Sequence, residues 1–487
     1  MNAMRHAAAV LFAGVLFGAS SAHALDHVWV IGGGPYPGHS QAQIEFNVNW
    51  VIQVLNAGAG ARQLHVYYTD GSTTGRDVVL WQSPAESKAS LQPLARVFGE
   101  HGPNGERFYS NRIPNVQAGT EASDLKARLE KDFSELKPGD RALLIYNGHG
   151  LQDQNDSAEN TLWLWNDTRL SVREMDQIMS RIDPTVPVRF VFTQCYSGGF
   201  ARLMHPQARD TLALGEANRC GFFAESEDRM SEGCSASIKV GDYRDYSTYF
   251  FAALNGRTRT GETIGVNPDR NGDNVVSLYE AHLFALSQAH NADLPRSTSE
   301  VFLERWQPWY LRWIDTGAEP DNVYGRMARE VAKKNGLPES GPALIEKMRV
   351  RRHAMTQKMT ELDGEHENLG REVKTLQKEI RKEIGLRWPE ALSPYTLNFV
   401  QFLKKDLDAA QDFILSHPRY PELVTKQDRH AALVHEEISS LDRDITQLDK
   451  ILRLRKLARL QSQFERHANE VERGWYQRLQ SCEGQPL

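Results

Sequence analysis

The sequence predicts an α/β fold, with a mostly parallel sheet flanked by helices, followed by a C-terminal all-α domain of coiled-coil or helical-hairpin type. Three observations lead to this prediction. Short apolar runs rich in β-branched and aromatic residues alternate with helix-length segments up to about residue 320. Two of these runs, 141–150 and 188–199, continue into glycines, as buried parallel strands do when they reach a loop. Beyond residue 320, apolar residues recur at alternating spacings of three and four among Glu, Lys, Arg and Gln.

The individual elements follow from local patterns. Apolar residues at helical spacing, such as Leu125, Leu129 and Phe133, predict a helix, and Ser171 with Glu174 has the spacing of a capping box. The region 71–119 is rich in Gly, Pro, Asn and Ser, which predicts an irregular insertion. In chain order the sequence predicts strands at 28–32, 63–68, 141–149, 161–165, 188–195 and 221–224, and helices at 40–55, 121–136, 171–183, 246–254 and 277–287.

The amino end has the features of a secretory signal peptide. Arg5 and His6 precede an apolar stretch that runs to about Ser20, and Ala22-His-Ala24 fits an A-x-A cleavage pattern. We therefore expect residues 1–24 to be removed and the protein to be secreted or periplasmic, with an uncut amino-terminal anchor as the alternative. No later segment approaches the ~20 apolar residues of a transmembrane helix.

The mature chain is expected to form two domains, at 25–320 and 321–487. A formal net charge of −6 gives no sign of nucleic-acid binding.

Four cysteines suit an oxidising compartment. Cys220 and Cys234 flank a loop that we expect a disulfide to close, with a stabilisation of ~3 kcal/mol on the chain-entropy model. Cys195 then stays a free thiol, and Cys482 is either unpaired or links two chains. Spacing alone does not settle the pairing, and a bond between Cys195 and Cys220 would remove the thiol from chemistry.

A His and a Cys end two of the predicted strands, His149 the first and Cys195 the second. Because parallel strands end at one edge of an open sheet, both side chains are expected there. An imidazole near a thiol favours the thiolate, which makes the sulfur a nucleophile. The backbone N–H groups of Gly150 and Cys195 are candidates for an oxyanion hole. The alternative is a core histidine and an inert buried cysteine.

The blocks Tyr-Asn-Gly-His149-Gly150 and Gln-Cys195-Tyr-Ser-Gly resemble the His-Gly and Cys blocks of the caspase/legumain-like cysteine peptidases. The resemblance covers roughly residues 26–311 and is closest to the legumain-like members. It implies a caspase-like sheet and a Cys–His dyad that hydrolyses peptide bonds, with His149 as general base and Cys195 as nucleophile.

The same resemblance implies a pocket for the residue before the scissile bond, lined by His39, Glu225, Ser226 and Asp245. Legumain-like enzymes carry an Arg and a Glu where this chain has Gly38 and Thr193. These departures favour a basic residue over Asn before the scissile bond, because a buried acid requires a partner. The alternative is that the acids are solvated loop charges.

A second pattern has the ligand spacing of an EF-hand calcium loop that leads into a helix. Asn274 replaces the usual Gly of such a loop, and Asn tolerates a left-handed backbone. Calcium would be structural or regulatory, and the proposed thiol chemistry requires no cofactor. The alternative is a polar loop in which a Ser and a Glu form a capping box. The predicted ligands are Asp269, Asn271, Asp273, Val275, Ser277 and Glu280.

The C-terminal heptads predict helices that bury their apolar stripes within one chain, with self-association as the competitor. Three functions stay open. The first is a secreted cysteine endopeptidase acting on protein or peptide substrates. The second is an inactive caspase-like scaffold that binds a partner through its helical domain. The third is a legumain-like ligase or transpeptidase, which transfers the acyl group to an amine.

Overall fold

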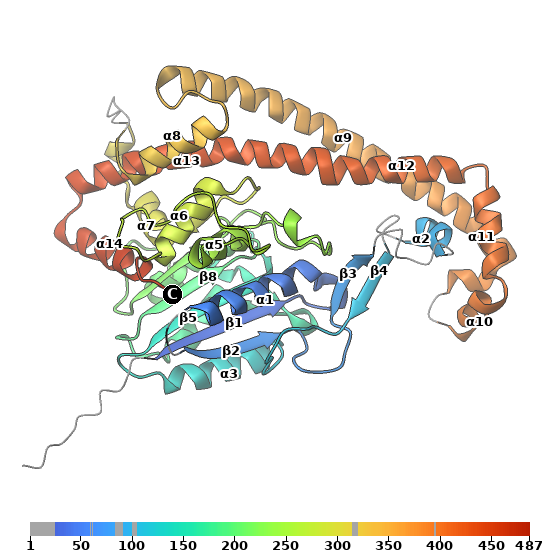
Figure 1. The fold of residues 1–487 in the computed structure, drawn as a ribbon, viewed down its shortest axis with the longest axis horizontal. Coiled ribbons are helices and arrows are strands. Elements are labelled where there is room, and N and C mark those ends of the chain that lie inside the picture. The colour runs from blue at the N-terminus through green and yellow to red at the C-terminus, as the bar shows by residue number, and fades with distance from the viewer. Residues whose placement is uncertain are drawn as a thin grey trace, which may run out of the picture.

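The central sheet has the strand order β10-β9-β8-β5-β1-β2 in a computed structural model that describes residues 25–58, 60, 62–82, 91–99, 105–313, 320–393 and 396–487 (Figure 1). Neighbouring strands from β2 to β9 pair in parallel, and the short β10 pairs antiparallel with β9. The prediction of an α/β fold with a mostly parallel sheet is confirmed. The signal peptide predicted at 1–24 lies outside the described residues. The strands are β1 Asp26–Gly33, β2 Arg62–Tyr68, β5 Arg141–Leu151, β8 Val188–Phe192, β9 Arg219–Phe223 and β10 Arg296–Ser297.

Helices cover both faces of this sheet. On one face, alternate residues such as Val30 and Ile145 pack against α1 Ala42–Ala57, α5 Tyr246–Asn255 and α6 Leu278–Gln288. On the other, Trp29 and Leu144 pack against α3 Ala122–Glu135, α4 Val172–Met179 and α7 Thr298–Trp306. The period of two along each strand therefore divides the core between two layers.

The far end of β5 is extended by a small antiparallel unit. β6 Thr161–Leu164 pairs with β5 from His149 to Leu151, and β7 Thr168–Ser171 pairs with β6. Ser171 and Glu174 form the expected capping box at the start of α4.

The insertion after β2 is more regular than the sequence predicts. β3 Val78–Gln82 and β4 Gly105–Tyr109 form a two-stranded antiparallel sheet. α2 Gln92–Phe98 packs Leu94 and Val97 into a core shared with the C-terminal helices. These elements are short and depend on distant partners, which explains why local composition did not reveal them.

The C-terminal region is helical, as predicted. α9 runs beside α12 and α13 as an extended helical hairpin (Figure 1). The buried stripe differs in detail from the predicted heptads, because Ile345 and Leu452 are exposed whereas Leu344 and Ile451 are buried. The elements are α8 Val323–Lys334, α9 Gly341–Arg387, α10 Leu397–Lys405, α11 Leu407–Ser416, α12 Tyr420–Ala432, a π-helical segment Leu433–Ile438, α13 Ser439–His467 and α14 Glu470–Glu483.

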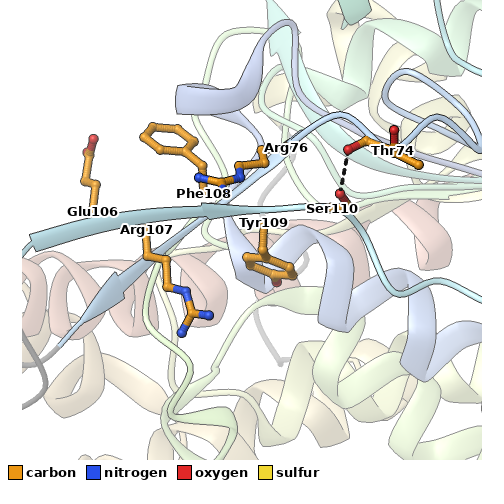
Figure 2. A pocket seen from close by; sticks show the side chains of 7 residues that line it. All are labelled: Thr74, Arg76, Glu106, Arg107, Phe108, Tyr109 and Ser110. Atoms are coloured by element: carbon orange, nitrogen blue, oxygen red, sulfur yellow. Dashed lines mark hydrogen bonds between the residues drawn. The ribbon is translucent and has the colours of Figure 1, made fainter.

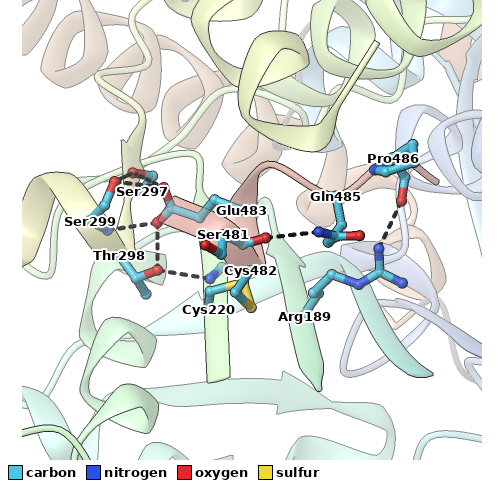
Figure 3. Close-up of a disulfide and its surroundings, with 11 residues drawn as sticks. Arg189, Cys220, Ser297, Thr298, Ser299, Ser481, Cys482, Glu483, Gln485 and Pro486 are labelled. Atoms are coloured by element: carbon cyan, nitrogen blue, oxygen red, sulfur yellow. Dashed lines mark hydrogen bonds between the residues drawn. A yellow bond between two sulfur atoms is a disulfide. The ribbon is translucent and has the colours of Figure 1, made fainter. Parts of the chain in front are cut away.

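The boundary predicted at residue 320 does not divide the core. Leu454 and Leu457 of α13 and Leu479 of α14 belong to the same buried cluster as Phe190 and Phe302 of the α/β part. The carboxylate of Glu483 is buried against Ser297, Thr298 and Ser299, and the Arg189 guanidinium donates to the Pro486 carbonyl at 2.8 Å (Figure 3).

The predicted disulfide between Cys220 and Cys234 is wrong, because Cys220 is bonded to Cys482 of α14 (Figure 3). Cys195 and Cys234 are free. Cys220 lies near the start of β9, and the chain must run to the other end of that strand before it reaches Cys234. A strand rises about 3.3 Å per residue, so the two thiols lie at opposite ends of the sheet. Cys482 thus neither stays unpaired nor links two chains.

Among the described helices, none combines the length and the apolar content that crossing a bilayer requires.

Replacing Cys220 and Cys482 together by Ala should lower the free energy of unfolding by about 3–5 kcal/mol, because the bond joins positions 262 residues apart. Urea unfolding followed by circular dichroism measures this loss. A non-reducing peptide map should recover a peptide pair joined through Cys220 and Cys482. A pair joined through Cys220 and Cys234 would contradict the assignment.

Candidate functional site

The structure brings His149 and Cys195 to the same edge of the sheet. β5 and β8 are paired in parallel with Tyr146 opposite Phe192, and the two residues each lie three positions beyond that pair. β8 ends at Phe192, and beyond it the chain continues against the end of β5. Gly150 lies directly against the second chain segment, since a Cβ there would be 2.2 Å from the Cys195 carbonyl oxygen.

The chain turns sharply after Cys195. Tyr196 has a left-handed backbone with φ of 59°, and a 3-10 helix, Ser197–Met204, begins immediately afterwards. Position 198 requires glycine, because a Cβ there would lie 2.7 Å from the Glu225 carbonyl oxygen. The chain therefore turns sharply at this point, and it is Tyr196, and not a glycine, that has the left-handed backbone.

Two acceptors fix the orientation of the His149 ring. Its Nε2 lies 2.8 Å from the His39 carbonyl oxygen and 2.9 Å from Gln41 Oε1. A carbonyl oxygen can only accept, so Nε2 carries the proton and Nδ1 presents the lone pair. His149 can therefore act as a base only through Nδ1.

The hydrogen-bond partner of Nδ1 is Cys234. Cys234 Sγ lies 3.7 Å from His149 Nδ1. Cys195 Sγ instead accepts a hydrogen bond from the Ser231 backbone N–H at 3.4 Å. Sequence reasoning missed Gln41 and Cys234 as site residues, because neither lies in a motif and both approach His149 from other parts of the chain.

Burial keeps the site neutral. It lowers the pKa of His149 to about 4, against the opposing effect of the His39 carbonyl. It raises the pKa of the Cys195 thiol, although the hydrogen bonds from Ser231 act in the other direction. It also raises the pKa of Cys234 well above its ordinary value, with Cys195 as the next contributor. At neutral pH the structure thus holds two thiols and an uncharged imidazole.

The pocket residues implied by the resemblance have different surroundings. The His39 ring lies 5.9 Å from the His149 ring and packs against Trp163. Asp245 is buried and accepts hydrogen bonds from Gln43, Asn47, Ser247 and Thr248. It is therefore not a solvated loop charge.

Glu225 and Ser226 are also buried, but their polar groups have partners within the protein. Glu225 accepts from the Leu294 N–H at 2.9 Å and pairs with Arg229 at 3.3 Å, and burial raises its pKa to about 7. Ser226 donates to Asp228 at 2.6 Å. Asp245 lies beside the part of the loop next to Cys234, since a Cβ on Gly233 would lie 3.4 Å from Asp245 Cβ, whereas Glu225 contacts that loop at Arg229.

The calcium loop has the expected backbone. Asn274 is left-handed with φ of 66°, and Asp269 accepts from the N–H groups of Gly272 and Asn274. Glu280 forms the alternative capping box with Ser277 and also accepts from the Arg270 and Asn271 N–H groups. Within the described residues no three His, Cys, Asp or Glu side chains gather for a metal ion. Calcium binding stays a prediction.

A separate hollow of about 490 Å³ follows β4 (Figure 2). The side chains of Glu106, Arg107, Phe108 and Tyr109 leave the strand in alternating directions around it, with Thr74, Arg76 and Ser110 alongside. None of these residues contributes to the site at His149. Their chemistry does not converge on one point, so the hollow is not taken as the reaction site.

Alkylation of Cys195 by iodoacetamide should be slow at neutral pH and should continue to accelerate above pH 9.0, the ordinary thiol pKa, because burial favours the protonated thiol. Nearby Asp293 and Glu225 act in the same direction, and Ser231 opposes them. Mass spectrometry of the Cys195 peptide measures the rate at each pH. A midpoint below that of a free cysteine would contradict the expected shift.

Gln41→Glu should raise the pKa of His149, because a carboxylate beside Nε2 stabilises the imidazolium. An NMR titration of the His149 ring measures the change, and Gln63→Glu, on the solvent side of β2, is the matched control. An unchanged His149 titration would show that Gln41 does not contact the ring in solution.

No family model matches the chain, and no curated protein matches it. Among solved structures, protein GSU0716 from Geobacter sulfurreducens is similar over 56% of this chain and 92% of its own, with 11% sequence identity and a TM-score of 0.33. A similarity of this size carries no argument about function.

Proposed function

We propose that the protein is a secreted or periplasmic cysteine endopeptidase of the caspase/legumain-like type. The observation that carries the proposal is the parallel pairing of β5 with β8, which directs His149 and Cys195 to the same edge of the sheet, where Gly150 lies against the Cys195 carbonyl. The ring orientation adds support, since Nε2 is held from behind and Nδ1 is left as the base.

In the proposed reaction, Nδ1 of His149 takes the proton of the Cys195 thiol as the sulfur attacks the scissile carbonyl carbon. The N–H groups of Gly150 and Cys195 would stabilise the oxyanion of the tetrahedral intermediate. The imidazolium then gives its proton to the leaving amine, and an acyl-enzyme remains. Water, deprotonated by His149, hydrolyses the thioester and restores the thiol.

Asp245 supports a preference for a basic residue before the scissile bond. Its carboxylate is buried, and the hydrogen bonds it accepts come from neutral amides and hydroxyls. Arg259 already interacts electrostatically with Asp245 from within the protein, so a substrate Lys or Arg would add a second positive charge near this buried acid. Glu225 is less suited to this role because Arg229 already pairs with it. Asn at this substrate position is the competing preference, and a structural calcium ion at 269–280 is compatible with either.

The test is an electrophilic peptide probe with Lys, Arg or Asn at the reactive position, added to the wild type, Cys195→Ala and His149→Ala. Labelling should disappear in Cys195→Ala and fall by about 10²-fold or more in His149→Ala, as expected on loss of a general base. Cleavage of a peptide library, with and without calcium, measures the specificity.

Lys358→Ala, at an exposed position on α9, is the control and should keep the wild-type labelling. Labelling that survives in Cys195→Ala, or no labelling of either the wild type or Arg443→Ala, which loosens the loop over Cys195, would favour the inactive scaffold. Products joined to an added amine in place of hydrolysis products would favour the ligase.

A further inference from the structure

A segment of the chain itself lies across the reacting atoms. Residues 229–236, here named the cover loop, follow β9 in the chain. They begin beside the turn at Tyr196 and cross the edge of the sheet towards β3. The Arg229 carbonyl accepts from the Tyr196 N–H at 2.8 Å, and at the other end the Ala236 carbonyl accepts from the Trp81 N–H at 2.8 Å. The loop is thus fixed on both sides of the His149–Cys195 pair.

Between these ends the cover loop contacts both members of the pair. The Ser231 N–H donates to Cys195 Sγ at 3.4 Å, and the Ser231 hydroxyl donates to the Thr193 carbonyl at 2.9 Å. Cys234 Sγ lies 3.7 Å from His149 Nδ1, and because Nε2 carries the ring proton, the Cys234 thiol is the donor. Ser235 exchanges two hydrogen bonds of 3.0 Å with Gln43.

These contacts compete with a substrate for both reacting groups. Attack requires a carbonyl carbon about 3–3.5 Å from the sulfur, with the imidazole lone pair available for the thiol proton. Here the Ser231 backbone lies on the sulfur and Cys234 uses the lone pair. Gly233 lies over Asp245, the residue best suited to bind a substrate side chain.

The cover loop is also held from behind by α13. Arg443 donates to Glu232 at 2.8 Å, and the Glu232 N–H donates to Asp293 at 2.7 Å. Arg229 contacts Thr446 of α13 at 3.3 Å. These residues do not touch His149 or Cys195, so they hold the loop without taking part in the chemistry.

We propose that the cover loop is an internal inhibitor and that Cys234 is its functional residue, which withholds the base His149 from Cys195 until the loop is displaced. This proposal rests on the proposed function and adds its regulation. The neutral state of all three groups agrees with it, since burial under the loop disfavours the thiolate.

The test is the rate of Cys195 alkylation by iodoacetamide at neutral pH, read from the Cys195 peptide by mass spectrometry. Cys234→Ala frees Nδ1, and Arg443→Ala loosens the loop at a distance from the site. Each should accelerate the alkylation by about tenfold, which is the increase in the thiolate fraction when the pKa of the thiol falls by one unit. Lys358→Ala, which removes an exposed ion pair on α9, is the matched control and should leave the rate unchanged.

Thermal unfolding shows whether each variant is folded, and if Cys234→Ala is not, Arg443→Ala alone decides. Folded variants that alkylate at the wild-type rate would overturn the proposal. Alkylation needs no peptide hydrolysis, so the two proposals can fail separately. Accelerated alkylation without any peptide cleavage would refute the endopeptidase and leave the cover loop standing.

Discussion

The arrangement depends on the position of β5 between β1 and β8. Parallel pairing on both sides leaves one register, in which Gly33 is opposite Gly148 and Tyr146 is opposite Phe192. The close approach at the β1 side requires glycine, because a Cβ on Gly148 would lie 2.6 Å from the Gly33 carbonyl oxygen. In this register the segment that follows β1 lies against His149, and its residues His39 and Gln41 orient the ring. A shift by one residue would turn His149 to the other face.

The His149 ring is oriented by burial against other parts of the chain. The same burial opposes the thiolate–imidazolium pair that thiol catalysis uses. Partial burial disfavours both thiolate and imidazolium, so the described state is chemically quiet. Displacing the cover loop would return water to the thiols and free Nδ1. Access to the site and its electrostatics are therefore controlled by one structural change, with no need for a separate activating residue.

The sequence identifies features that depend on neighbouring residues and misses those that depend on distant ones. The strands that lead to His149 and Cys195 and the capping box at Ser171 follow from local pattern and are present, although β5 runs on to Leu151 and β8 already ends at Phe192. The partner of Cys220 lies in the last helix, which no spacing argument could select. Cys234 reaches His149 from a loop 85 positions away, and its role depends on how that loop is folded back.

The contact between α13 and the cover loop is ionic, through Arg443 and Glu232, and α13 also carries a buried charge beside it. Lys450 of α13 is buried and donates to the Ala289 carbonyl and to Asn291, and burial lowers its pKa to about 8. Asp293, which holds the Glu232 N–H, has its pKa raised well above the ordinary value for the same reason. Buried charges add little net stability, but they tolerate few alternative positions.

Because α13 continues through the π-helical segment Leu433–Ile438 into α12, the distal half of the helical hairpin is covalently continuous with the helix that positions the loop. A ligand that binds the hairpin can thus act on the cover loop through α13, or through His435, whose ring packs on Trp81 at the other end of the loop.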